Sequence, residues 1–448
     1  MSSLSPLKNE SLLLVFTYAP AGLGHLRMAN TLYQGLPDAE ELNTILFGSH
    51  DRLIESLHRF ISVHPFTRAL MEWVQRGWPQ DVFTSFYRSL LRWRTKTLYH
   101  QLSLLLEQKI STTKTVLVIA THFGLAHQLA GIKEKLGQER GIKVILVVQV
   151  TDDTPQHLWY IQGADLIFVP SQKTKNMLLE YVRLSNLPQV NFVTRAYPIN
   201  PLLTKKLNQT AFKNRVEQTL IEKTKPTNIA IPVSGAAVWM DFFRLLIESL
   251  NSKKANCLFH VVSKDTPHTY PFLEKMRKTK NTSLYVSFED KEVVKSYDEL
   301  YSSVPIAFEI TKPSEQAFKA LLTPKMVGGS ILLFSKPVGR QERDNLDFLK
   351  RHQLIPSETE QNLLFELSYQ DQALSSSQAK DLQTKALGWR GLCLPDSPQK
   401  ASSFIIWGLK KKLFSQMMNY QKPAKPSPEV GQQGVKEFWE KVAEILPD

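Results

Sequence analysis

Short apolar segments, each followed by a polar turn and then by a helix-like pattern, recur through the first half of the chain. They occupy residues 12–17, 115–120, 144–150 and 166–170. Each is too short for a buried helix and rich in residues that favour strands. Because strands that are buried on both faces and alternate with helices pair in parallel, the spacing predicts an α/β fold built on a parallel sheet.

A second series of strands begins beyond a break in the pattern near Pro198 and Pro201. It restarts at residues 228–233 and predicts further strands at residues 257–263, 283–287, 306–310 and 330–334. A chain of 448 residues is also too long for one ordinary core. We therefore predict two Rossmann-like domains that face each other across a cleft, with ligands at the carboxyl ends of the strands.

The domain boundaries follow from these breaks. We predict an N-terminal domain over residues 1–200, a linker over 201–227 and a C-terminal domain over 228–400. A Pro-rich stretch at residues 422–428 precedes a helical pattern whose apolar face includes Phe438 and Trp439. We expect the helices of residues 401–448 to pack back on the N-terminal domain.

The chain is basic, with 55 Lys and Arg against 42 Asp and Glu, a net charge of +13. This charge favours an anionic partner such as a nucleic acid, an anionic lipid or a nucleotide-sugar, and does not choose among them. Two cysteines exclude a disulfide framework, and no Cys/His cluster has the spacing of a zinc site. We expect no bound metal, no signal peptide, no nucleic-acid module and only peripheral membrane contact.

A glycine turn in the first domain carries a histidine. Gly22-Leu23-Gly24-His25 lies between the first strand and the helix after it. Glycines there let a ligand approach the backbone, and His25 can act as a base. The alternative is a simple tight turn.

A polar cluster follows the strand at residues 144–150. It contains Asp152, His157 and Trp159, and a carboxylate at this position can orient or activate a hydroxyl. The alternative is a helix capped by Asp152 or Thr154, with Trp159 in the core.

Two polar motifs follow strands of the second domain. In Lys312-Pro313-Ser314-Glu315, Ser314 is placed to cap a helix whose N–H groups can hold a phosphate. In the second motif, Gln341, Glu342 and Asn345 share one helical turn and can read sugar hydroxyls. A plain serine cap and a solvated helix start are the alternatives.

Together these motifs resemble the monogalactosyldiacylglycerol synthase family, which is glycosyltransferase family 28-like. The most specific match is the stretch TDDTPQHLWYIQGADLIFVPSQKTK, within residues 150–175, and the resemblance covers about residues 12–350. Three features depart from the family pattern: only one glycine remains in the loop at 234–239, Ser314-Glu315 replaces a Gly-Gly pair, and Ala320 stands where an acidic residue is expected.

The resemblance implies a GT-B fold and an inverting displacement that needs no metal or other cofactor, with a UDP-sugar as the donor substrate. His25 is then the base and Asp152 the second catalytic candidate. The implied donor-binding residues are Ser234, Gly235, Phe288, Lys312, Ser314, Glu315, Gln341, Glu342 and Asn345. The implied acceptor-binding residues are Gly22, Gly24, His157 and Trp159.

Aromatic and basic residues are interleaved over residues 66–99. The membrane-contacting candidates are Trp73, Trp78, Arg88, Arg92 and Trp93. This composition suits a helix at an anionic lipid surface. Core helices with basic outer faces are the alternative.

These features favour a hexosyltransferase of glycolipid synthesis, moving a sugar from a UDP-sugar to a diacylglycerol-like acceptor. We expect it in the cytoplasm, peripheral on the inner face of the membrane. The first alternative is a GT-B-fold protein that has lost transfer and binds a nucleotide-sugar or lipid. The second is an epimerase of a soluble UDP-sugar.

Overall fold

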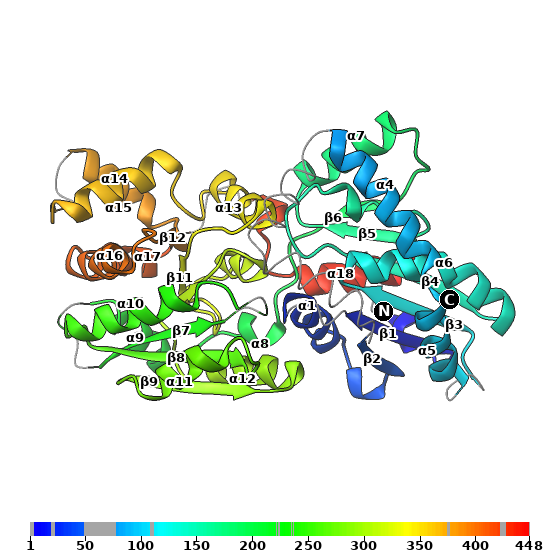
Figure 1. Cartoon of the computed structure of the whole chain (residues 1–448), viewed down its shortest axis with the longest axis horizontal. Helices are drawn as coiled ribbons and strands as arrows, with labels where there is room; N and C mark the ends of the chain where they lie inside the picture. Colours follow the sequence, from blue (N-terminus) through cyan, green and yellow to red (C-terminus); the bar gives the residue numbers. More distant parts are fainter. Residues whose placement is uncertain are drawn as a thin grey trace. The chain divides into compact units, whose positions relative to one another are not determined.

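The chain folds into two compact units, described here from a computed structural model (Figure 1). Unit 1 comprises residues 1–200 and 433–448, and unit 2 comprises residues 201–432. The structure describes residues 4–18, 23–48, 78–107, 112–220, 222, 225–233, 235, 237–373, 377–421 and 427–447.

Unit 1 is built on a six-stranded parallel sheet with the strand order β2-β1-β3-β4-β5-β6. The strands are β1 (Leu12–Tyr18), β2 (Thr44–Gly48), β3 (Thr115–Ala120), β4 (Lys143–Gln149), β5 (Leu166–Val169) and β6 (Phe192–Thr194). The helices are α1 (Leu23–Gln34), α4 (Trp78–Trp93), α5 (Lys96–Glu107), α6 (Phe123–Arg140), α7 (Gln172–Leu184) and α18 (Gly434–Ala443), with short 3-10 turns η1 (Ser5–Lys8), η2 (Ala39–Glu41) and η3 (His157–Trp159).

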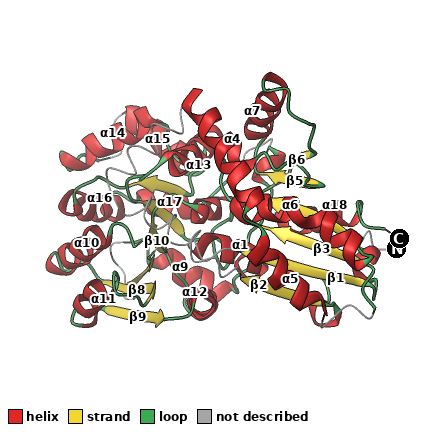
Figure 2. Cartoon of the chain, turned by 45° about the vertical axis from the view of Figure 1, so that its right-hand side comes forward, coloured by secondary structure: helices red, strands yellow, loops and turns green. Residues whose placement is uncertain are grey.

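Alternate residues of the central strands bury both faces of this sheet. Leu13 and Val15 of β1 face a core shared with α5 and α6, which Figure 2 shows lying over the strands. Phe16 points the other way, against Tyr33 of α1 and Trp439 of α18. Burial on both faces explains the continuous apolar runs in the sequence.

The last helix, α18, completes unit 1. Trp439 Nε1 donates to Leu32 O at 3.0 Å, and Phe438 packs on Phe168 of β5 with 4.4 Å between ring centroids. At Gly434 a Cβ would lie 2.3 Å from Ala196 O, so only glycine permits this approach.

Unit 2 is a second six-stranded parallel sheet, with the order β12-β11-β10-β7-β8-β9. The strands are β7 (Thr227–Pro232), β8 (Cys257–Lys264), β9 (Thr282–Ser287), β10 (Phe308–Thr311), β11 (Ile331–Phe334) and β12 (Gly391–Cys393). The helices are α8 (Pro201–Thr204), α9 (Gln209–Glu217), α10 (Met240–Ser252), α11 (Tyr270–Arg277), α12 (Asp290–Ser303), α13 (Arg340–Arg351), α14 (Glu358–Tyr369), α15 (Ser377–Ala386), α16 (Pro398–Lys410) and α17 (Leu413–Met418), with 3-10 turns η4 (Glu315–Leu321) and η5 (Pro428–Val430).

Two segments differ from the expected domain organisation. Residues 201–227, expected as a linker, fold into unit 2, where Arg215 of α9 is fully buried. Helices α16 and α17, expected on the N-terminal domain, pack in the core of unit 2 through Phe404, Ile405 and Phe414, and only α18 joins unit 1. The reason is that their buried side chains share one core with the strands of unit 2, as where Phe414 packs on Phe308 of β10.

Candidate functional site

The order of the strands identifies one ligand-binding position in each sheet. In unit 1 the order reverses between β1 and β3, and in unit 2 it reverses between β7 and β10. Counted within unit 2, the order is 3-2-1-4-5-6, that of dinucleotide-binding Rossmann domains. Open α/β sheets bind ligands outside the carboxyl ends of their strands at such reversals.

His25 lies at the reversal in unit 1. It is in the first turn of α1, directly after β1, and its Nδ1 lies 2.6 Å from Thr121 O, just beyond β3. A carbonyl oxygen only accepts, so Nδ1 carries the proton and the basic lone pair of neutral His25 is on Nε2. This is the tautomer that a base needs if it approaches its substrate through Nε2. Gly24 lies in the same turn, whereas Gly22 lies outside the described residues.

A second histidine at this reversal was not predicted. The rings of His25 and His122 meet edge to face with 4.7 Å between centroids. His122 follows β3 and caps α6, its Nδ1 accepting from Leu125 N at 3.4 Å. Only the pairing of β1 with β3 brings these residues together across 97 positions, since 122 − 25 = 97. A Thr-His pair directly after a buried strand was the available sequence signal.

The two adjacent carboxylates after β4 have different roles. Asp153 is buried and accepts from Ser171 Oγ and from Thr174 Oγ1, the latter at 2.7 Å, so it anchors the start of α7. Asp152 is half-buried and accepts from Thr151 Oγ1 at 3.3 Å. Ser171, and neither Asp152 nor Thr154, makes the capping bond of the next helix.

Two predicted acceptor-binding residues, His157 and Trp159, pack against other side chains of unit 1. Trp159 is 1% exposed and lies in the core with Phe123 against its ring at 5.8 Å. This burial favours the alternative interpretation, a core tryptophan. His157 is half-buried and stacks on Tyr181 at 3.7 Å.

The arginines predicted to contact a membrane point into unit 1. Arg88 lies over the rings of Tyr160 and Tyr181, 5.3 and 5.8 Å from their centroids. Arg92 donates to Gln162 O at 2.6 Å, and burial lowers the pKa of its guanidinium. Cation–π and carbonyl contacts thus hold both side chains against unit 1, and their assignment to a lipid surface stays a prediction.

The outer face of α4 carries exposed aromatic rings beside two exposed serines, Ser85 and Ser89. Trp93 is 81% exposed and Phe86, seven residues earlier, is 69% exposed. Trp73 and the side chain of Trp78 lie outside the described residues.

The loop after β7 reaches the reversal in unit 2. Within it Ser234 lies outside the described residues, and Gly235 is exposed. Ala237 and Trp239 have left-handed backbones with φ of 51° and 65°. Glycine adopts this conformation readily and other residues do so at a cost of roughly 1–2 kcal/mol each. Two non-glycine residues of this loop therefore adopt a backbone geometry that glycine favours.

The two polar motifs of the second domain meet at the end of β10, the strand that pairs with β7. Lys312 Nζ lies 2.7 Å from Glu342 Oε1, and Glu342 Oε2 accepts from Val338 N at 2.7 Å. Asn345 is fully buried and donates from Nδ2 to Pro313 O at 3.1 Å. Glu342 and Asn345 of α13 thus hold the segment that follows β10.

The helix expected after Ser314 is a seven-residue 3-10 turn, η4. Ser314 occupies its N-cap position but makes no capping bond through its side chain. A turn this short lacks the dipole of a full helix, so the expected helix N-terminus for a phosphate is not formed. Glu315 and Gln341 are half-buried, and Phe288, just beyond β9, is 73% exposed.

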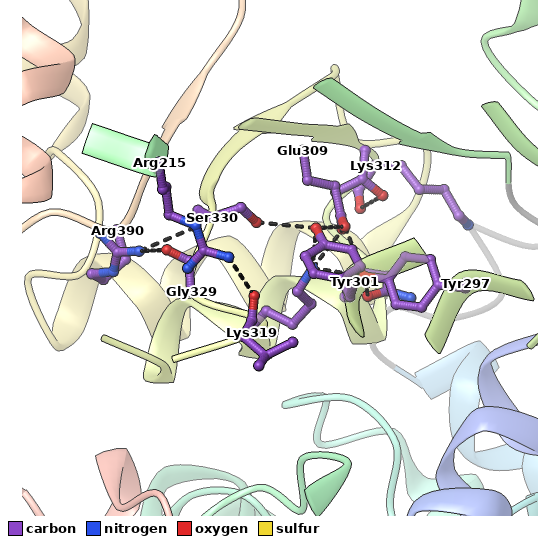
Figure 3. Close-up of polar contacts among 12 residues, drawn as sticks. Arg215, Tyr297, Tyr301, Glu309, Lys312, Lys319, Gly329, Ser330 and Arg390 are labelled. Atoms are coloured by element: carbon purple, nitrogen blue, oxygen red, sulfur yellow. Dashed lines mark hydrogen bonds and ion pairs between the residues drawn. The ribbon is translucent and has the colours of Figure 1, made fainter. Parts of the chain in front are cut away.

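A buried polar network joins the two elements that flank this segment (Figure 3). Lys319 of η4 donates to Glu309 of β10 at 2.7 Å, and to the hydroxyls of Tyr297 and Tyr301 at 2.6 and 2.7 Å. Burial and the Glu309 carboxylate raise the pKa of Tyr301 well above its usual value. The strand and η4 are thereby tied together on either side of Lys312.

Two buried arginines hold the loop between η4 and β11. Arg215 donates to the carbonyls of Pro324, Met326 and Val327, and Arg390 donates to those of Leu322, Gly329 and Ser330. Burial lowers the pKa of Arg215 to about 10 and that of Arg390 to about 9. Carbonyl oxygens take the place of carboxylates as their partners.

Comparison with solved structures identifies the fold. A UDP-GlcNAc 2-epimerase from Neisseria meningitidis, bound to UDP-GlcNAc, matches 97% of this chain and 99% of its own at a TM-score of 0.51 and 13% identity. The fold is GT-B. MurG of Acinetobacter baumannii matches 97% of this chain and 99% of its own at a TM-score of 0.45 and 10% identity. This likeness is too distant to support any further conclusion. No protein-family profile and no curated protein matches the sequence.

The GT-B fold accounts for the two strand reversals but leaves the chemistry to the residues around them. Within the described part of the chain, no helix is long and apolar enough to cross a membrane. Among the same residues, no three His, Cys, Asp or Glu side chains gather as metal ligands would.

Proposed function

We propose that the protein transfers a hexose from a UDP-sugar to the hydroxyl of a lipid acceptor at a membrane surface. The observation that carries the proposal is the position of His25 at the strand reversal of unit 1, with Nδ1 bonded to Thr121 O and Nε2 as its basic nitrogen. The resemblance to the synthase family supports the choice of donor and acceptor.

In the proposed reaction the acceptor oxygen attacks the anomeric carbon of the donor. A bond forms between that carbon and the acceptor oxygen, the bond to the UDP oxygen breaks, and UDP leaves with the bonding electrons. Nε2 of His25 takes the acceptor proton as the bond forms. A single displacement of this kind inverts the anomeric centre.

Unit 2 is proposed to hold the donor. Lys312, next to the reversal, offers a positive charge to the diphosphate, and Glu342 fixes its position through the 2.7 Å ion pair. Phe288 presents an exposed ring on which a uracil can stack. The other donor residues implied by the resemblance are Ser234, Gly235, Ser314, Glu315, Gln341 and Asn345.

The membrane contact is proposed to use the outer face of α4. Phe86 and Trp93 present exposed rings on this face, and the exposed residues Arg94 and Lys96 follow at its end. Aromatic rings beside basic side chains suit the headgroup region of an anionic bilayer. We therefore propose a peripheral position on the inner, cytoplasmic face of a membrane.

A second candidate is a GT-B-fold protein that binds a nucleotide-sugar or lipid without transfer. The left-handed Ala237 and Trp239 favour it, since their side chains occupy a loop where glycines would let a diphosphate approach the backbone.

One assay separates these candidates. The full chain is incubated with labelled UDP-sugars and vesicles of mixed lipids that include diacylglycerol. A labelled lipid supports transfer. Saturable UDP binding without a labelled product supports the binding protein, and conversion of the free UDP-sugar into its epimer supports an epimerase.

A further inference from the structure

His122, the residue two positions beyond β3, contacts the proposed base directly. Its ring meets that of His25 at 4.7 Å with 88° between the planes. His122 is itself 1% exposed and stacks on Phe123 at 4.7 Å and 23°. Because the ring of His122 is buried and packs on Phe123, it has little freedom to move away from His25.

Thr121 holds His25 through both its side chain and its backbone. Thr121 O accepts from His25 Nδ1 at 2.6 Å, and Thr121 Oγ1 donates to His25 O at 2.9 Å. Together, Thr121 and His122 make three contacts with the one histidine. Their position is fixed by the register of β1 and β3, in which Thr17 pairs with Ala120.

We propose that His122 is a positioning residue for His25. Its ring blocks rotation of the His25 imidazole away from Thr121 O, so the proton stays on Nδ1 and Nε2 remains the basic nitrogen. The role of His25 as base rests on the proposed function, but its tautomer does not. His122 exchanges no proton with the substrate in this scheme.

The ring of His122 and its capping bond can be separated by two substitutions. His122→Asn keeps a good N-cap for α6 and removes the ring. His122→Phe keeps a ring against His25 and removes the cap. His127→Gln is the control: this buried histidine of the same helix bonds Leu158 O at 3.0 Å, and glutamine can donate the same bond.

The first measurement is the tautomer of His25 in the full chain, from imidazole nitrogen shifts in histidine-labelled protein. We expect the Nδ1–H form in the wild type, in His122→Phe and in His127→Gln, and a mixture of the two forms in His122→Asn. The Nδ1–H form alone in folded His122→Asn would overturn the proposal, and so would a mixture in folded His122→Phe.

The second measurement is kinetic. His122→Asn should lower kcat by about 10- to 100-fold, the usual effect of a misplaced reacting group. It should change the pH profile of kcat and leave KM for the UDP-sugar within about twofold, because the candidate donor residues belong to unit 2. His122→Phe should restore kcat to near the wild-type value. A protein that transfers no sugar would refute the proposed function, and the tautomer measurement would still decide the role of His122.

Discussion

Lys319 and Glu309 form an ion pair in the interior of unit 2, with Nζ and Oε2 2.7 Å apart and side chains 4% and 0% exposed. The lysine has three acceptors around it, Glu309 and two tyrosine hydroxyls. A buried pair need not be more stable than an apolar replacement of both residues, but loss of one partner leaves an uncompensated charge.

Lys319→Met should therefore lower the free energy of unfolding of unit 2 by about 3–5 kcal/mol. Lys295→Met is the control, because Lys295 pairs with Glu299 at 3.9 Å on the surface, where such pairs contribute about 0–1 kcal/mol. Urea unfolding followed by tryptophan fluorescence measures both. Equal midpoints for the two variants would show that the buried pair carries no such energy.

His25→Ala should lower turnover about 100- to 10,000-fold, the contribution of a positioned general base. UDP binding should be nearly unchanged, since His25 belongs to unit 1 and the candidate donor residues to unit 2. Asp152→Asn should also slow turnover, because its carboxylate can orient the imidazole or the hydroxyl. Near-wild-type turnover of His25→Ala would remove it from the mechanism, and full activity of His25→Gln would leave it only a hydrogen-bonding role.

The donor-binding assignment is tested by Gln341→Ala with Glu342→Ala. Loss of the charge-assisted bond that fixes Lys312 should weaken UDP binding about 10- to 100-fold. Asp347→Ala, on the same helix and half exposed beside Lys350, should bind UDP as the wild type does. Titration calorimetry on the full chain gives both affinities, and an unchanged affinity in the double variant would contradict the assignment.

His127 should make the protein sensitive to acid. Burial lowers its pKa from 6.5 to about 3, so it stays neutral in the folded chain while the unfolded chain takes up a proton. Stability is then lost as the pH falls below 6.5, by about 2 kcal/mol at pH 5. His260, with its pKa lowered to about 4 by burial, adds to the same trend.

His127→Gln keeps the bond to Leu158 O and removes this titration. Its free energy of unfolding, from urea curves at pH 8 and pH 5, should fall less between the two than that of the wild type. The same fall in both proteins would show that His127 is not the group responsible.

The membrane proposal rests on Phe86 and Trp93. Replacing both by Ser should reduce binding to phosphatidylglycerol vesicles at least tenfold, because each ring buried in the interface contributes about 1.5–3 kcal/mol at full burial. Tyr270→Ser with Tyr369→Ser is the control, since these are exposed aromatics of unit 2. Sedimentation at low and high salt separates the apolar contribution from the screened charges. Equal loss in both double variants would place the contact elsewhere.

The sequence predicted the sheets better than the details of the sites. The strand at 115–120 was located to the residue, because a continuous apolar run bounded by polar residues has one interpretation. Strands β2, β6 and β12 were missed. Three residues carry too little pattern in β6 and β12, and β2 is a half-buried edge strand of five residues.

Composition alone did not predict which way the side chains of residues 66–99 face. Arginines and aromatics along residues 66–99 pointed to a lipid surface, yet Arg88 faces the protein and Phe86 faces outward. Two positions along a helix turn the side chain by about 200°, so residues of one segment divide between opposite faces. His122 was missed because its partner, His25, is near only once β1 and β3 pair.

The division of unit 1 between residues 1–200 and 433–448 has a consequence for synthesis of the chain. All of unit 2 emerges from the ribosome before α18 does, so unit 2 can fold while Phe16 and Phe168 of unit 1 still lack the helix that covers them. Domains generally fold in the order in which they are made. Unit 1 is made first here, but it can complete its fold only after unit 2 has been made. Until α18 docks, these two aromatic side chains lack their apolar cover on the nascent chain.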